Sequence, residues 1–170
     1  MIKTFCDRID RVNDWVGKYV SWLVIPLTFV VTYDVVLRYL FDRPTIWAWD
    51  IAVQILASIA ILGGGNALLV GAHIGIDVIV ERISPKKRAV IGLITYVFFF
   101  FSVGILLWKT TAGAWASALI GERSYSYAAP PVYPLKIVMA VGVLLLFLQG
   151  IANFIRLLSK ISSFKTGGNA

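Results

Sequence analysis

Four long segments without a charged side chain constrain this sequence more than any other feature. They comprise residues 19–33, 51–72, 89–108 and 137–155. A helix needs roughly 20 apolar residues to cross a bilayer core about 30 Å thick. Three segments meet that requirement, and the first meets it if Asp34 lies inside the span. The sequence therefore predicts four membrane spans, at about residues 17–38, 48–72, 87–110 and 135–157.

The type of secondary structure follows from the pattern within these segments. They are continuously apolar rather than alternating, which favours helices over the strands of a closed barrel. Charged residues make up only 15% of the chain, against about 25% in soluble domains. We predict an all-α integral membrane protein in which residues 1–161 form one transmembrane domain of four helices. The polar, Gly-rich residues 162–170 are expected to form a disordered tail.

Basic residues predict the orientation of the spans. Most of the 16 Lys and Arg lie in the N-terminal flank, the segment between spans 2 and 3, and the C-terminal tail. The positive-inside rule places these regions, and hence both termini, in the cytoplasm. The same distribution explains the net charge of +7, so we expect no nucleic-acid partner. Nothing in the sequence supports an enzyme or a cofactor, because a single His and a distant single Cys make no metal site.

The N-terminal segment and the first span each carry a further signal. Phe5, Ile9, Val12 and Val16 repeat at helical spacing, which predicts an amphipathic helix in the membrane interface ahead of span 1. Within span 1, Pro26 is expected to kink the helix, because proline lacks an N–H and its ring collides with the preceding turn.

Asp34 and Arg38 form the most informative charged pair at membrane depth. Their spacing of four places both on one helix face, with the acid nearer the N-terminus. One interpretation is a proton or substrate site, and the other is an ion pair that holds span 1 against span 2. We favour the ion pair, because each charge has a neutralising partner. Asp50 opens span 2 and is expected to cap that helix or to approach Arg38 or Arg43.

Span 2 contains Gly63-Gly64-Gly65-Asn66, which permits two interpretations. The glycines either unwind the helix to expose backbone groups or allow a neighbouring helix to approach closely. Close packing is favoured, since the other half of the chain has no counterpart. His73, Asp77 and Glu81 follow at spacings of four and predict one polar face. The outer segment before span 4 is rich in Tyr and Pro, the composition of a contact surface. Tyr is favoured both at protein contacts and at lipid headgroups, so both interpretations stay open.

Three groups of residues follow one another in a recognisable order. They are Arg38-Tyr39, Pro44, Trp47 and Asp50 around the first outer loop; Gly64, His73 and Asp77 in and after the Gly-rich span; and Pro131 and Pro134 before span 4. Taken in this order, they resemble the small membrane subunit of TRAP (tripartite ATP-independent periplasmic) transporters, the DctQ-like family. That family often has Glu where Asp50 opens span 2 here.

This resemblance implies a non-catalytic subunit in the bacterial inner membrane. Its partners would be a large TRAP membrane subunit, a periplasmic substrate-binding protein and membrane lipids. The small subunit would scaffold the large one and help to dock the binding protein during sodium-coupled uptake of an organic anion, a carboxylate. Two alternatives from other classes are a self-sufficient proton-coupled four-span exporter, in which Asp34 would be the essential acid, and a membrane anchor of an oxidoreductase complex.

Overall fold

The structure is a computed structural model that describes residues 2–71 and 85–166. Apart from one isolated bridge between Arg123 and Pro131, the regular structure of this part is helical, which confirms the predicted all-α fold. Four helical segments are long and apolar enough to cross a membrane. The helices are α1 (Ile2–Ser21), α2 (Val24–Leu40), α3 (Ala48–Leu69), α5 (Pro85–Ile120) and α6 (Tyr133–Thr166).

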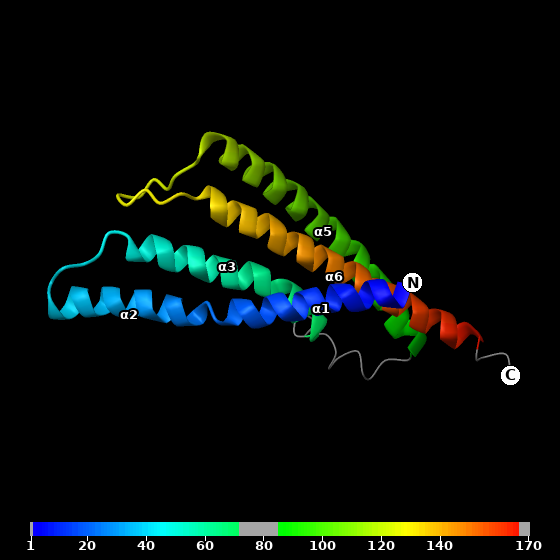
Figure 1. Ribbon diagram of the computed structural model, residues 1–170. Coiled ribbons are helices and arrows are strands. Elements are labelled where there is room, and N and C mark those ends of the chain that lie inside the picture. The colour runs from blue at the N-terminus through cyan, green and yellow to red at the C-terminus, as the bar shows by residue number, and fades with distance from the viewer. Residues whose placement is uncertain (1, 72–84, 167–170) are drawn as a thin grey trace.

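The long helices form a layer in the order α2, α3, α6 and α5. Each packs on the next, and α1 lies against both α3 and α6. Figure 1 shows the helices fanning out from the end that holds the start of α1 and the end of α6, toward two loops at the opposite end. Burial is low in such a layer, and α2 has no buried residue at all. Much of the surface of the layer is therefore open, apart from the part of α3 and α6 that α1 covers.

Glycines set the distance between neighbouring helices in this layer. A Cβ added at several of them would overlap a side chain or backbone of the adjacent helix, so the helices approach more closely than larger residues allow. These contacts are Gly142 against Ile61 between α6 and α3, Gly150 against Phe99 and Gly92 against Leu157 between α6 and α5, and Gly17 against Asn66 and Gly65 against Asn13 between α1 and α3.

α1 and α2 follow one another along nearly the same line, with a break at residues 22–23 (Figure 1). Pro26 causes the break, because it offers no N–H to the carbonyl four residues earlier. That carbonyl, on Trp22, instead accepts the amide of Ile25 at 3.1 Å. The kink predicted from Pro26 is therefore confirmed, and its effect lies one turn before the proline.

Several helix ends differ from the predicted boundaries. The first membrane-crossing candidate begins at Lys3 and ends at Leu40, whereas the sequence suggested 17–38. α5 continues to Ile120, well past 110, and ends where Gly121 adopts a positive φ of 59°. The amide of Glu122 then bonds the Ser117 carbonyl at 3.1 Å, a helix-closing pattern that left-handed glycine permits. α6 extends to Thr166, beyond the predicted limit at 161.

Candidate functional site

Asp34 organises the corner between α2 and α3. Its carboxylate pairs with Arg38 at 2.7 Å, as their spacing predicts. The same carboxylate accepts hydrogen bonds from the backbone amide of Thr45, at 3.0 Å, and from the Thr45 hydroxyl. Asp34 thus fastens the loop that leads into α3, so its charge is already balanced and its lone pairs are largely used. This geometry supports the ion-pair interpretation over that of a free acid in a transport path.

Aromatic stacking completes this corner. The rings of Tyr33 and Trp47 stack with centroids 6.1 Å apart. Ala48, which follows Trp47 and begins α3, is buried. Tyr39 and Pro44 of the predicted motif are both exposed. Trp47 therefore holds the corner, whereas Tyr39 and Pro44 face outward.

Asp50 joins α3 to the second outer loop. Its carboxylate accepts the hydroxyl of Ser126, which is 76 positions away in sequence. Neither Arg38 nor Arg43, the predicted partners, bonds Asp50 in the described chain, since Arg38 is bonded to Asp34. The bridge from Asp50 reaches the second outer loop instead, and Asp50 lies in the first turn of α3, the position where a helix dipole favours a carboxylate.

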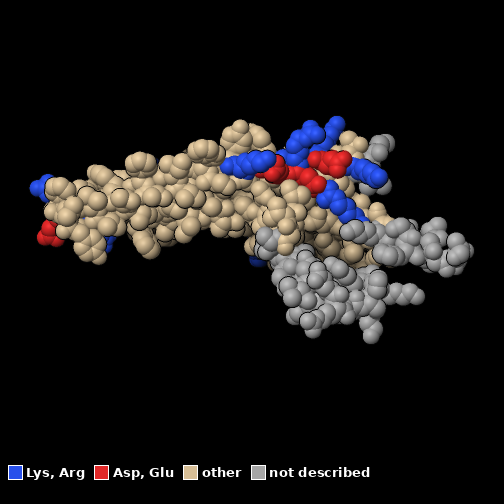
Figure 2. Space-filling view, turned by 90° about the horizontal axis from the view of Figure 1, so that it is seen from below, with Lys and Arg blue, Asp and Glu red and all other residues tan. Residues whose placement is uncertain are grey.

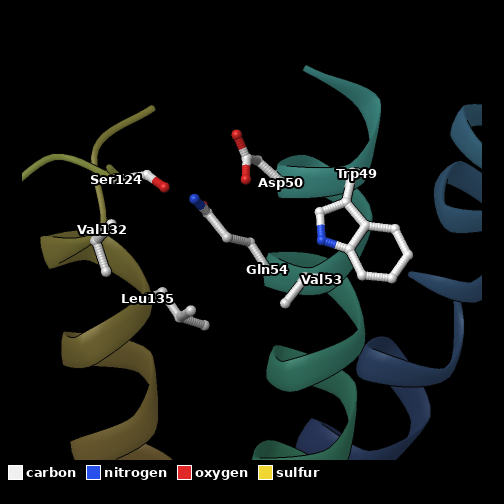
Figure 3. A pocket seen from close by; sticks show the side chains of 7 residues that line it. All are labelled: Trp49, Asp50, Val53, Gln54, Ser124, Val132 and Leu135. Atoms are coloured by element: carbon white, nitrogen blue, oxygen red, sulfur yellow. The ribbon is translucent and has the colours of Figure 1, made fainter. Parts of the chain in front are cut away.

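A cleft of about 190 Å³ lies beside Asp50, between α3 and the start of α6. Figure 3 shows Asp50 and Gln54 pointing from α3 toward Ser124 and Val132. The Gln54 amide also approaches the Pro131 carbonyl at 3.4 Å. Pro134 lies in the first turn of α6, where its missing N–H costs nothing. The predicted motif residues of both outer loops thus gather at one end of the molecule.

The base of the second outer loop carries an ion pair between Glu122 and Lys136. The Lys136 ammonium holds the pKa of Glu122 below its ordinary value. The backbone of Glu122 also accepts the Val132 amide at 2.9 Å. These contacts close the connection from α5 to α6.

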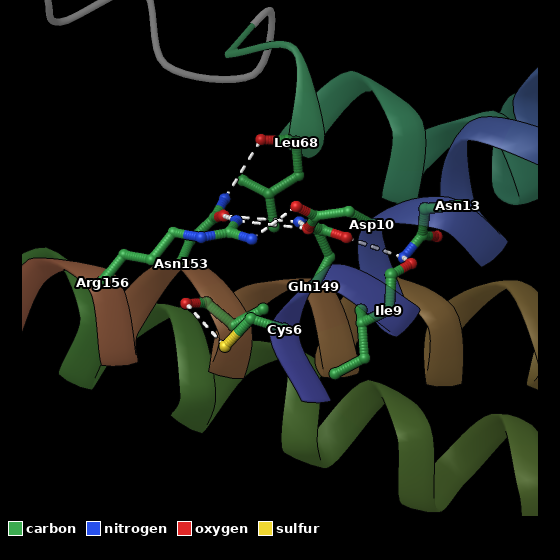
Figure 4. A network of polar contacts seen from close by, with 9 residues as sticks. Cys6, Ile9, Asp10, Asn13, Leu68, Gln149, Asn153 and Arg156 are labelled. Carbon is green, nitrogen blue, oxygen red and sulfur yellow. Dashed lines mark hydrogen bonds and ion pairs between the residues drawn. The ribbon is translucent and has the colours of Figure 1, made fainter. Parts of the chain in front are cut away.

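The opposite end of the molecule holds most of the charge, as the face drawn in Figure 2 shows. Here Asp10 of α1 pairs with Arg156 of α6. Gln149, completely buried, donates to Asp10 at 2.9 Å and accepts from Asn13 at 2.8 Å. Asn153 extends the network to the carbonyl of Leu68 at 3.2 Å (Figure 4). This network fastens α1 to α6 and α3.

Beside the network, α1 and α3 interlock through two asparagine–glycine contacts. Asn13 of α1 lies over Gly65, and Asn66 of α3 lies over Gly17. The close-packing interpretation of the glycine motif is thus supported for Gly65. Gly64, the predicted contact, has no neighbour within 4 Å of the position that a Cβ would take, and α3 remains helical throughout the motif.

The face of α1 that packs on the other helices is a different one from its apolar stripe, which is expected to lie in the membrane interface. Phe5 and Val12 are each 48% exposed, and of the predicted stripe only Ile9 is buried. The buried face contains instead Cys6, Ile9, Asn13, Gly17 and Val20. Small and polar residues line it because they meet Gly65, Gln149 and Ala152 of the neighbouring helices. The polar residues Gln149 and Asn153, four apart inside an uncharged segment, were the available signal for this contact.

The third predicted group, His73, Asp77 and Glu81, lies outside the described residues. Within residues 2–71 and 85–166, no three His, Cys, Asp or Glu side chains gather in a way that could hold a metal ion. The candidate site in the described part of the chain consists of two clusters of helix-joining contacts, one at each end of the layer.

Four helices long and apolar enough to cross a membrane, with paired charges at both ends of the layer, indicate a small multi-pass membrane protein. Residues 27–160 match the family model of the DctQ component of tripartite ATP-independent periplasmic transporters. Because the match covers most of the sequence, the chain belongs to the DctQ family, a family of transporter components rather than enzymes. A search of curated proteins finds no match to the chain.

Proposed function

We propose that this chain scaffolds the large membrane subunit of a TRAP transporter and helps to dock the periplasmic substrate-binding protein. In this scheme the large subunit carries an organic anion, a carboxylate, inward with sodium. The small subunit contributes surfaces and no substrate site. We further propose that it lies in the bacterial inner membrane with both termini in the cytoplasm, where the excess of basic residues favours them.

The observation that carries this proposal is the layered arrangement of the helices in a DctQ-family chain. A layer leaves the sides of α2, α3, α5 and α6 open, whereas a self-sufficient transporter surrounds its substrate path with helices. The charges of Asp34, Glu122 and Asp10 are paired within the chain. This pairing favours a static scaffold over a proton-coupled exporter, because an exporter needs an ionisable acid that is free to release its proton.

The outer end is the surface that we assign to docking. Two loops meet there (Figure 1), and the side chains of Tyr39, Trp49, Tyr125 and Tyr127 are mostly exposed. Exposed Tyr and Trp are favoured at protein interfaces. Asp34, Thr45 and Asp50 hold the loops in place behind these aromatic side chains. We therefore assign the motif at the outer end to presenting a contact surface.

Reconstitution into proteoliposomes tests the scaffold directly. Vesicles containing this chain alone are expected to show no ion-gradient-dependent uptake of a carboxylate. Vesicles with all three components are expected to take it up, and omission of this chain should abolish or strongly reduce that uptake. Uptake by vesicles that contain this chain alone would contradict the scaffold proposal. Full uptake by vesicles that lack this chain would contradict it as well.

Arg38→Ala tests the corner at the outer end. We expect the variant to weaken co-purification of the large subunit more than it alters substrate preference, because Asp34 loses its cation while Thr45 remains. Arg43→Ala is the matched control, since Arg43 is exposed in the loop that follows α2 and forms no ion pair with a described residue. A changed substrate spectrum with intact assembly would contradict the scaffold role.

A further inference from the structure

A second cleft, of about 180 Å³, lies between α5 and α6 near their outer ends. Two lysines line it, Lys109 from α5 and Lys136 from α6, together with Thr110, Gly113, Ala114 and Met139. The two lysines come from antiparallel helices and are separated by the whole outer loop in sequence. We propose that this cleft binds the headgroup of an anionic phospholipid, with its phosphate between the two ammonium groups.

The depth of the cleft supports this ligand. Lys109 immediately follows the uncharged segment 89–108, and Lys136 immediately precedes the uncharged segment 137–155. Each segment is long enough for a bilayer core, so both lysines mark the same membrane margin. The indoles of Trp108 and Trp115 are 70% and 71% exposed on α5, and exposed tryptophans favour the headgroup level.

The charge of the cleft also fits a phosphate. Lys136 shares its charge with Glu122, whereas Lys109 forms no ion pair with the described residues. The Lys109 ammonium lies 5.3 Å from the centre of the Trp108 ring, which holds it near the indole. Two lysines against one carboxylate leave a net positive cleft at the surface where phosphates of lipid occur. Ala114 and Met139 provide apolar lining for the glycerol and upper acyl chain.

Gly113 gives the cleft its space. No atom lies within 4 Å of the position that a Cβ would take there, so a larger side chain enters the cleft without disturbing the fold. Gly104 has an equally open Cβ position on the same helix but lies outside the cleft. The two glycines therefore provide a matched pair for blocking the cleft with leucine.

Native mass spectrometry of the full chain in detergent tests the site, with phosphatidylglycerol and phosphatidylcholine of identical acyl chains as probes. We expect tighter binding of phosphatidylglycerol. Lys109→Gln should weaken it about fivefold, the usual contribution of one lysine near anionic lipid, and Gly113→Leu should also weaken it. Lys3→Gln, which removes the same charge at the other end, and Gly104→Leu should leave binding unchanged.

Glycerol 3-phosphate is the third probe, because it carries the phosphate without acyl chains. It is expected not to displace the lipid at equal concentration. Equal binding of the two lipids, equal effects of Lys109→Gln and Lys3→Gln, or displacement by glycerol 3-phosphate would each overturn the proposed lipid site. The test needs neither the large subunit nor the binding protein, so its outcome is independent of the scaffold proposal.

Discussion

Replacing Gly142 by alanine tests whether close glycine contacts hold the layer together. Gly142 lies on the face of α6 that meets α3. An added Cβ would lie 2.5 Å from Cγ2 of Ile61 and 2.9 Å from its carbonyl oxygen. The side-chain methyl group can rotate away, but the carbonyl belongs to the α3 backbone and cannot. Gly142→Ala therefore forces α3 and α6 apart along their shared interface.

The magnitude follows from two opposing effects. Forcing one methyl group into a packed contact costs about 1–3 kcal/mol. Alanine in place of glycine within a helix stabilises it by up to about 1 kcal/mol. Gly104→Ala on α5 experiences only the second effect, because its Cβ position has no neighbour within 4 Å. The difference in unfolding free energy between the two variants cancels helix propensity and isolates the packing cost, about 1–3 kcal/mol.

Unfolding of each variant in mixed detergent micelles, with increasing denaturing detergent, measures this difference. Gly142→Ala should unfold at a lower denaturant fraction than the wild type, and Gly104→Ala at an equal or higher one. If both variants unfolded together, the helices would not depend on the Gly142 contact. That result would refute the argument that glycines set the spacing of the layer.

Three further changes address the two ends of the layer. Thr45→Val removes one donor to Asp34 and should speed hydrogen exchange of the Thr45 amide, at a cost of about 1 kcal/mol; unchanged exchange would count against the corner. Arg156→Ala leaves Asp10 unpaired and should speed exchange across α1, whereas the exposed Arg8→Ala should not. The third change concerns Glu122, whose pKa is lowered in the folded chain. Its ion pair with Lys136 stabilises the loop at pH values above the ordinary carboxyl pKa of 4.5. This stabilisation is lost as the pH falls through the lower pKa of the folded chain. Exchange of the Val132 amide, corrected for its intrinsic rate, should rise over that acidic range in the wild type but not in Lys136→Met.

Features that depend on neighbouring residues in sequence were predictable. Uncharged segments of bilayer length predicted the spans, Pro26 predicted the kink, and the four-residue spacing of Asp34 and Arg38 predicted their ion pair. Each follows from helix geometry alone, without knowledge of the tertiary arrangement. The helix ends were less accurate, because α5 and α6 continue beyond the apolar segments and α5 ends only at Gly121.

Features that depend on distant partners were not predictable. The inward face of α1 is set by Gln149 and Gly65 on other helices, so the apolar spacing within α1 did not reveal it. The outer loops carry several hydroxyl and cationic side chains that could bond Asp50. Only the folded structure identifies Ser126 as its partner. The same holds for the glycine motif, since any of its three glycines satisfies the sequence rule and the rotation of α3 selects Gly65.

The lack of burial in α2 has a consequence for how the layer presents itself to a partner. Since none of its residues is buried, core packing alone does not fix the position of α2. The two ends of α2 fix its position instead. One end is joined to α1 at residues 22–23, and the other is held by the contacts of Asp34 and Trp47. α1 is in turn fastened by Asp10 and Gln149 to α6. A helix held at both ends, with only its side toward α3 in contact, keeps the rest of its surface open while retaining a defined position, as the proposed scaffold role requires.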